Sequence, residues 1–123
     1  MKFDKLSNQV IECAINVHRA LGSGLLESTY EQCLAYELKQ KGIPFKLQYP
    51  LPVKYKGIKL DCGYRVDVYI ENKLIVELKS IEKVLPIHKA QLLTYMKLAK
   101  IKVGLLINFN VLTLKEGLKR YVL

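Results

Sequence analysis

The stretch from Tyr64 to Ser80, YRVDVYIENKLIVELKS, constrains the fold of this chain more than any other part of the sequence. Side chains alternate between two faces along a β-strand, so each residue of its two halves can be assigned to a face. The polar segment at residues 71–73 suits a short hairpin loop between the halves. A loop of this length puts Asp67 opposite Glu77, with Lys79 on the same face. The sequence therefore predicts a β-hairpin on which two carboxylates and an ammonium group converge.

These charges have an ordinary interpretation and a functional one. Alternating apolar and charged residues are typical of a hairpin with one solvated face. The second strand, LIVEL, is nevertheless apolar on both faces except at Glu77, as expected for an interior strand. A carboxylate buried there costs on the order of several kcal/mol unless it is paired or bound to a metal ion. The pattern thus favours a functional site at Glu77.

Length and charge define the class of protein. The 123 residues, 50% of them hydrophobic, predict one folded domain over residues 1–123. The net charge of +9 predicts a polyanionic partner, with nucleic acid first and an anionic membrane surface second. The lysines are scattered along the chain, so any basic surface must be assembled by folding.

The sequence also indicates a compartment. Its N-terminus lacks the apolar segment of a signal peptide, and no apolar run is long enough to span a bilayer. We therefore expect a cytoplasmic protein without a membrane partner. Cys13, Cys33 and Cys62 are odd in number and widely spaced, which indicates neither a disulfide framework nor a zinc site.

Hydrophobic periodicity predicts helices and strands on both sides of the hairpin. The expected elements are helices at 4–21 and 26–41, strands at 45–55 and 58–62, the hairpin at 64–80, a helix at 86–99 and a strand at 103–109. The strands at 45–55 and 58–62 would form a second hairpin on one side of the sheet, and Pro50 and Pro52 indicate that its first strand is an edge strand or a bulged one. The apolar strand at 103–109 is typical of a parallel strand reached by a right-handed crossover. Residues 112–123 fit a helix or an edge strand. An antiparallel hairpin beside a parallel strand makes the sheet mixed, so the predicted fold class is α/β with a mixed sheet.

Two of these helices carry polar residues on or beside their inner faces. His88, Gln91 and Tyr95 form a polar stripe on the helix that follows the hairpin. Glu27 lies in the first turn of the helix at 26–41, beside an inward stripe that begins at Leu26. An acidic residue at that position also complements the helix dipole without any catalytic role.

An acidic pair beside a lysine is what metal-assisted phosphodiester hydrolysis requires. Oxygen ligands suit Mg²⁺ or Mn²⁺, which lower the pKa of a bound water. Asp67 and Glu77 are the candidate ligands, and Lys79 is the candidate cation for the nucleophile and the developing charge. A metal ion would also neutralise carboxylates that a buried strand could not otherwise hold.

These residues carry a family resemblance. Asp67 followed by Glu77-Leu78-Lys79 resembles the D…(D/E)xK signature of the PD-(D/E)XK nuclease superfamily. The segment GLLESTY at 24–30 matches the motif that names the GxxExxY family within that superfamily. The similarity continues through residues 48–53, 55–57, 88–95 and 104–109, so it covers nearly the whole chain. One departure is Val66, which stands before Asp67 in place of a proline, at a position where many members vary.

The resemblance implies a restriction-endonuclease-like core of helix, three-stranded meander, helix and strand, here preceded by an extra N-terminal helix. It implies that Glu27 is the helical acid near the metal and a further candidate ligand, and that the backbone carbonyl of Leu78 adds a ligand. Gln91 and Tyr95 match the QxxxY motif that some branches carry beside the active site. The expected substrate-binding or supporting residues are Gln91, Tyr95, Tyr30 and His88.

Three functions follow from these observations. The first is a Mg²⁺-dependent nuclease that acts on DNA, or alternatively on RNA. The second is a structure-selective endonuclease similar to archaeal Holliday-junction resolvases, which are small, basic and normally homodimeric. The third is a non-catalytic module with a nuclease-like fold that binds nucleic acid or protein. Substrate, number of metal ions, oligomeric state and pathway are not encoded in any motif of the sequence.

Overall fold

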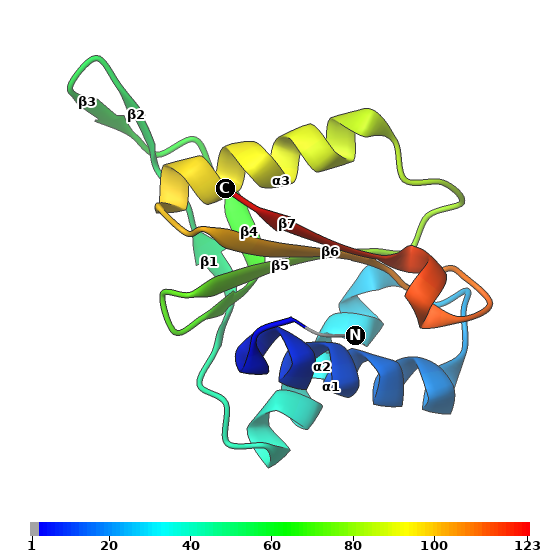
Figure 1. The fold of residues 1–123 in the computed structure, drawn as a ribbon. Coiled ribbons are helices and arrows are strands. Elements are labelled where there is room, and N and C mark those ends of the chain that lie inside the picture. Colours follow the sequence, from blue (N-terminus) through cyan, green and yellow to red (C-terminus); the bar gives the residue numbers. More distant parts are fainter. Residues whose placement is uncertain (1–2) are drawn as a thin grey trace.

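A computed structural model of the protein describes residues 3–123, which form three α-helices, a five-stranded mixed sheet and a separate two-stranded sheet (Figure 1). The elements are α1 (Lys5–Leu21), α2 (Glu27–Gln40), β1 (Lys46–Pro50), β2 (Val53–Tyr55), β3 (Ile58–Leu60), β4 (Arg65–Ile70), β5 (Leu74–Lys79), α3 (Pro86–Ala99), β6 (Val103–Asn108), the 3₁₀ helix η1 (Leu114–Gly117) and β7 (Leu118–Val122). The main sheet has the order β1-β4-β5-β6-β7, in which β5 and β6 are parallel and the other pairs are antiparallel. The predicted α/β class is confirmed.

The helices cover the main sheet on both faces. Figure 1 shows α3 on one face and α1 with α2 on the other. Between the sheet and α1 with α2 lies one apolar core, which includes Val76 from β5 and Leu34 from α2. Between the sheet and α3 lies a second core, in which Ile75 packs with Leu92 and Met96. β5 is therefore buried on both faces, as its apolar sequence predicts.

The helix boundaries follow from local capping. Asp4 caps α1, because its Oδ2 accepts the N–H of Ser7 at 2.9 Å, and the helix ends where Gly22 adopts a left-handed φ of 74°. α3 begins at Pro86 and ends at Ala99, as predicted. The second helix departs from its prediction in one detail: Leu26 is its N-cap and is 73% exposed, so it does not belong to the inward stripe.

The central hairpin has its predicted form. β4 and β5 are joined by the three residues 71–73, with Ile70 opposite Leu74 and Val68 opposite Val76. The loop begins with Glu71 and Asn72 in left-handed backbone conformations, which is how such a tight turn reverses the chain. Together with β1, the hairpin forms an antiparallel three-stranded meander.

The prediction of one long strand at 45–55, paired with 58–62 on one side of the sheet, was wrong. β1 ends at Pro50 and lies at the sheet edge, which agrees with the effect expected of its proline. The N–H of Leu51 still bonds to Tyr64, but Pro52 has no N–H with which to continue the ladder. The chain therefore leaves the sheet, and β2 with β3 forms a separate hairpin that projects from the body of the molecule (Figure 1).

For the C-terminal segment the sequence predicted either a helix or an edge strand, and the structure contains a short helix followed by an edge strand. The 3₁₀ helix η1 leads directly into β7, which pairs antiparallel with β6 and forms the second edge of the main sheet. Within residues 3–123, no helix combines the length and apolar character needed to cross a bilayer.

Candidate active site

Two acidic side chains fill the space where β4 and β5 separate. The backbone pairing of the two strands extends to Val68 and Val76, and the next residues are Asp67 and Glu77. The N–H of Asp67 donates to Glu77 Oε1 at 3.3 Å. The N–H of Leu78 donates to Asp67 Oδ2 at 2.8 Å. Side-chain oxygens thus take the place of the backbone ladder, and the two carboxyl groups adjoin.

The environment of Glu77 disfavours its charged form. Glu77 is only 5% exposed. Burial, and then the neighbouring Asp67 carboxylate, raise the pKa of Glu77 to about 9. The hydrogen bond from the Asp67 backbone N–H and the charge of the Lys79 ammonium offset only part of this effect. Glu77 therefore holds a proton at neutral pH unless a cation replaces it. A buried acid of this kind beside a second carboxylate fits a divalent metal ion.

Lys79 opens onto a groove beside the acidic pair. The groove has a volume of about 710 Å³ and is also lined by His88, Gln91 and Tyr95 from α3. Gln91 donates its amide N–H to the Tyr95 hydroxyl at 3.2 Å. Burial, and then the charge of Glu77, raise the pKa of Tyr95, so this phenol lies within electrostatic range of the acidic pair. The structure thus brings Lys79 and the polar stripe of α3 to one groove.

His88 has a second role at the start of α3. Its Nδ1 accepts the N–H of Leu85 at 2.9 Å, which caps the first turn of the helix. This hydrogen bond fixes the ring at the groove wall. His88 is therefore placed to support the groove as well as to line it.

The helical acid that reaches the hairpin is Glu31. The amide of Gln48 donates to Glu31 Oε1 at 2.6 Å and to Asp67 Oδ1 at 3.2 Å, and so bridges the two carboxylates. Glu31 is buried, and its burial raises its pKa, as do the charges of Asp67 and Glu27. Gln48 adopts a left-handed backbone with φ of 50°, which is uncommon for a residue other than glycine.

Glu27 lies at the edge of this acidic cluster, where its charge still acts on Glu31. It is exposed in the first turn of α2, one turn before Glu31. Sequence reasoning missed Glu31 and Gln48, whose side chains hydrogen-bond to each other and, through Gln48, to Asp67. The role of Glu27 as the helical acid near the metal stays a prediction. A signal for Glu31 was present, because it precedes the buried Leu34 and Leu38 by three and seven residues and so shares their face.

Tyr30 belongs to the core rather than to the groove. Its ring is fully buried and stacks on Phe109 with centroids 4.3 Å apart. Its hydroxyl donates to the carbonyl of Gly22 at 2.7 Å and accepts the N–H of Leu25 at 3.1 Å. Tyr30 thus fixes the loop between α1 and α2, in which Gly24 has a φ of 93°. These contacts support the fold around the loop between α1 and α2. A role of Tyr30 in substrate binding stays a prediction.

The donor set at the hairpin is small. Among residues 3–123, no group of three or more His, Cys, Asp or Glu side chains is arranged to hold a metal ion. A site here would use Asp67, Glu77 and the backbone at Leu78, whose carbonyl points to the same side of the extended strand as its N–H. Two carboxylates with retained waters are a usual arrangement for Mg²⁺.

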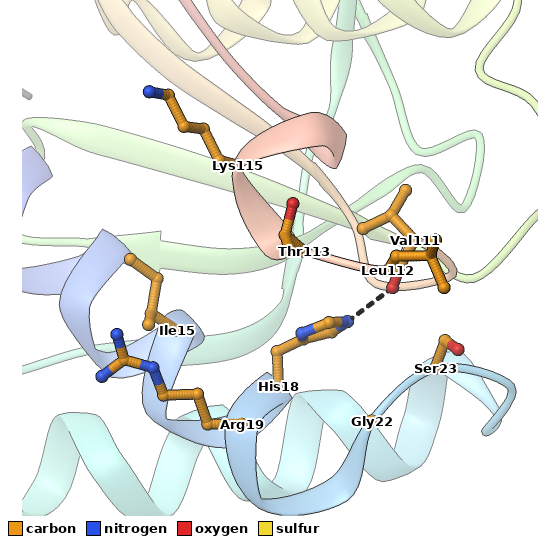
Figure 2. Close-up of a pocket in the computed structure, with 9 residues that line it drawn as sticks. All are labelled: Ile15, His18, Arg19, Gly22, Ser23, Val111, Leu112, Thr113 and Lys115. Atoms are coloured by element: carbon orange, nitrogen blue, oxygen red, sulfur yellow. Dashed lines mark hydrogen bonds between the residues drawn. The ribbon is translucent and has the colours of Figure 1, made fainter.

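A second cavity is separate from these residues. It measures about 510 Å³ and lies between the end of α1 and the loop that leads into η1 (Figure 2). None of the predicted site residues lines it. His18 points across it and donates Nε2–H to the carbonyl of Val111 at 2.9 Å, which ties α1 to that loop.

A comparison with protein families decides the assignment. Residues 4–121 match the family described as the PD-(D/E)XK nuclease superfamily. The chain belongs to this superfamily. In this PD-(D/E)XK protein, the predicted signature acids Asp67 and Glu77 lie on adjoining strands of the meander, with Lys79 two residues after Glu77. Nuclease activity and divalent metal ions are general in the superfamily.

Other comparisons add no closer relative. Neither the search of curated proteins nor the search of solved structures found a significant match. Because the match is to the superfamily as a whole, membership of the GxxExxY family stays a prediction. The substrate must therefore be argued from the chain's own residues.

Proposed function

We propose that this protein is a divalent-metal-dependent nuclease that hydrolyses phosphodiester bonds in DNA, with Mg²⁺ or Mn²⁺ as its cofactor. The observation that carries the proposal is the adjoining pair of the half-buried Asp67 and the buried Glu77, where two strands separate. Lys79, two residues after Glu77, lines the neighbouring groove. The basic character of the chain, with a net charge of +9, supports a nucleic-acid substrate.

Each residue then has a role that its contacts support. Asp67, Glu77 and the Leu78 carbonyl would hold the cation, which when bound supplies a water of lowered pKa and charge neutralisation at the phosphate. Glu31 positions Asp67 through the Gln48 amide. The Lys79 ammonium steadies the nucleophile and the developing charge. Gln91 and Tyr95 line the groove in which the substrate would lie.

The test is cleavage of DNA with purified protein in Mg²⁺ or Mn²⁺ and in EDTA. We expect cleavage only with metal, and a loss of about 100-fold or more in Asp67→Asn, Glu77→Gln and Lys79→Gln. Glu82→Gln and Lys83→Gln make the same chemical changes at exposed positions just after the hairpin and should leave cleavage unchanged. Circular dichroism checks that each variant is folded.

Cleavage that persists in all three site variants would refute the proposal. Supercoiled, linear, single-stranded and four-way-junction DNA, together with RNA, should be compared in the same assay. Preference for the junction would identify a resolvase-like enzyme. Salt-sensitive binding with no cleavage of any substrate would instead identify a non-catalytic module.

A further inference from the structure

We propose that the β2–β3 hairpin, residues 53–60, is an arm that binds the phosphate backbone of nucleic acid beside the groove. The inference rests on the proposed function for the identity of the partner. It concerns a segment that no step of the proposed hydrolysis uses. The first observation is that the hairpin forms its own two-stranded sheet and projects from the body of the molecule (Figure 1).

The register of the hairpin separates its side chains by chemistry. Directly opposite residues of an antiparallel pair share a face. Lys54 lies opposite Lys59 on one face. The pairs on the other face are Val53 with Leu60 and Tyr55 with Ile58. One face of the arm is therefore purely basic and the other purely apolar.

The basic face is unfavourable in the isolated protein. Like charges directly opposite each other destabilise a strand pair, and a two-stranded hairpin is only marginally stable in water. Within residues 3–123, the ion pairs join Lys41 to Glu12 and Arg120 to Asp4, so neither of them neutralises this face. A polyanion on the basic face would remove the repulsion. Charge complementarity thus favours a phosphate backbone as the occupant.

The base of the arm reaches the candidate active site. Val53, the first residue of β2, lines the same groove as Lys79 and Tyr95. A nucleic acid strand in the groove would therefore lie against the base of the arm. At the tip, the Lys56 ammonium lies 5.4 Å from the centre of the Tyr55 ring, and Tyr55 is 59% exposed. Lysines beside an exposed aromatic ring are typical of surfaces that bind nucleic acid.

The apolar face admits a different occupant, a second copy of this chain. Tyr55, Ile58 and Leu60 are all exposed on it. Pairing of two apolar faces would leave the repulsion between Lys54 and Lys59 unchanged, whereas a phosphate backbone would neutralise their charges. The observations therefore favour nucleic acid, and self-association becomes an outcome that the experiment must detect.

The experiment measures binding of a fluorescent 30-base-pair DNA duplex in EDTA at several salt concentrations, so that cleavage does not interfere. The test variant is Lys54→Gln/Lys59→Gln. The matched control is Lys115→Gln/Lys119→Gln, which removes the same charge from exposed positions on η1 and β7. A third variant replaces residues 54–59 by Asn-Gly, which can close a two-residue turn because Val53 and Leu60 lie opposite each other.

We expect the test variant to bind roughly tenfold more weakly and to lower the salt slope of log Kd by about 1.8, the value for two lost phosphate contacts. The variant lacking residues 54–59 should lose at least as much, and the control should match the wild type. Cleavage at saturating DNA should stay within about twofold, because the arm lies outside the metal centre.

Two results would refute the proposal that the hairpin binds nucleic acid. One is wild-type affinity and salt slope in both hairpin variants. The other is a dimer by light scattering that the variant lacking residues 54–59 converts to a monomer with unchanged DNA binding, which would make the hairpin an interface between copies. Hairpin-dependent binding by a wild-type protein that cuts nothing in Mg²⁺ would support the arm and refute the proposed nuclease.

Discussion

At Glu77 the requirements of folding and of chemistry oppose each other. The carboxyl lies in a strand that is apolar on both faces, beside a second carboxylate. The folded state is most stable when Glu77 is neutral, whereas metal binding requires Glu77 to be ionised. The conflict predicts a measurable dependence of stability on pH.

In EDTA, the wild type should lose stability as the pH rises from about 4.5 to about 9. The folded-state pKa of Glu77 is raised from 4.5 to about 9, so within this range the folded chain retains a proton that the unfolded chain releases. Glu77→Gln removes this proton-linked loss and should be more stable than the wild type at pH 8 by on the order of 5 kcal/mol. Urea unfolding at pH 5 and pH 8 measures the difference. Glu82→Gln serves as the control, and a pH dependence of Glu77→Gln parallel to that of the wild type would contradict the assignment.

Glu31 and Glu27 offer a matched pair on one helix. Glu31→Gln should lower metal-dependent cleavage by about 10-fold to 100-fold, because it weakens the bridge through Gln48 that orients Asp67. Glu27→Gln makes the same change on the exposed surface one turn earlier and should have less than a twofold effect. Single-turnover cleavage compares the two. A larger loss in Glu27→Gln would restore the role that the sequence motif predicted for it.

At the scale of elements, the loop between α1 and α2 depends on one hydroxyl group. Tyr30→Phe keeps the ring stacked on Phe109 but removes the hydrogen bonds to Gly22 and Leu25. We expect a loss of about 1 kcal/mol in unfolding free energy and retained cleavage. Tyr36→Phe, at a ring that is 61% exposed on the same helix, should change neither quantity. Abolished cleavage in a stable Tyr30→Phe protein would show that this residue acts on the substrate.

At the scale of the whole molecule, two glycines allow close approach between distant parts of the chain. A Cβ on Gly104 would lie 2.6 Å from Met96 Sδ, between β6 and α3. A Cβ on Gly117 would collide with the backbone carbonyl of Asn108. A flexible methionine can move, but a carbonyl held within the sheet cannot.

We therefore expect Gly104→Ala to cost about 1 kcal/mol and Gly117→Ala about 3 kcal/mol or more. Thermal and urea unfolding measure the loss of stability in each variant, and the two losses are compared directly with each other. The reverse order of destabilisation would show that the packing of α3 is the more rigid contact.

The sequence by itself determined the features that depend on local physics. The central hairpin, its three-residue loop and the placement of Asp67 opposite Glu77 follow from alternation and turn length. The bounds of α1, α2 and α3 follow from caps, Pro86 and periodicity, within one residue at each end. The resemblance to the PD-(D/E)XK superfamily rests on local motifs, and the family match over residues 4–121 confirms it.

Tertiary structure decided which distant groups meet. The rotation of α2 against the sheet brings Glu31 to Gln48 and, through it, to Asp67. This rotation depends on how Tyr30 and Leu34 pack rather than on any motif. The separation of the β2–β3 hairpin from the main sheet likewise depends on β1 finding its partner in β4, while Pro52 cannot extend that ladder. Helix rotation and strand partners are set by contacts between residues far apart in the sequence, which local patterns cannot specify.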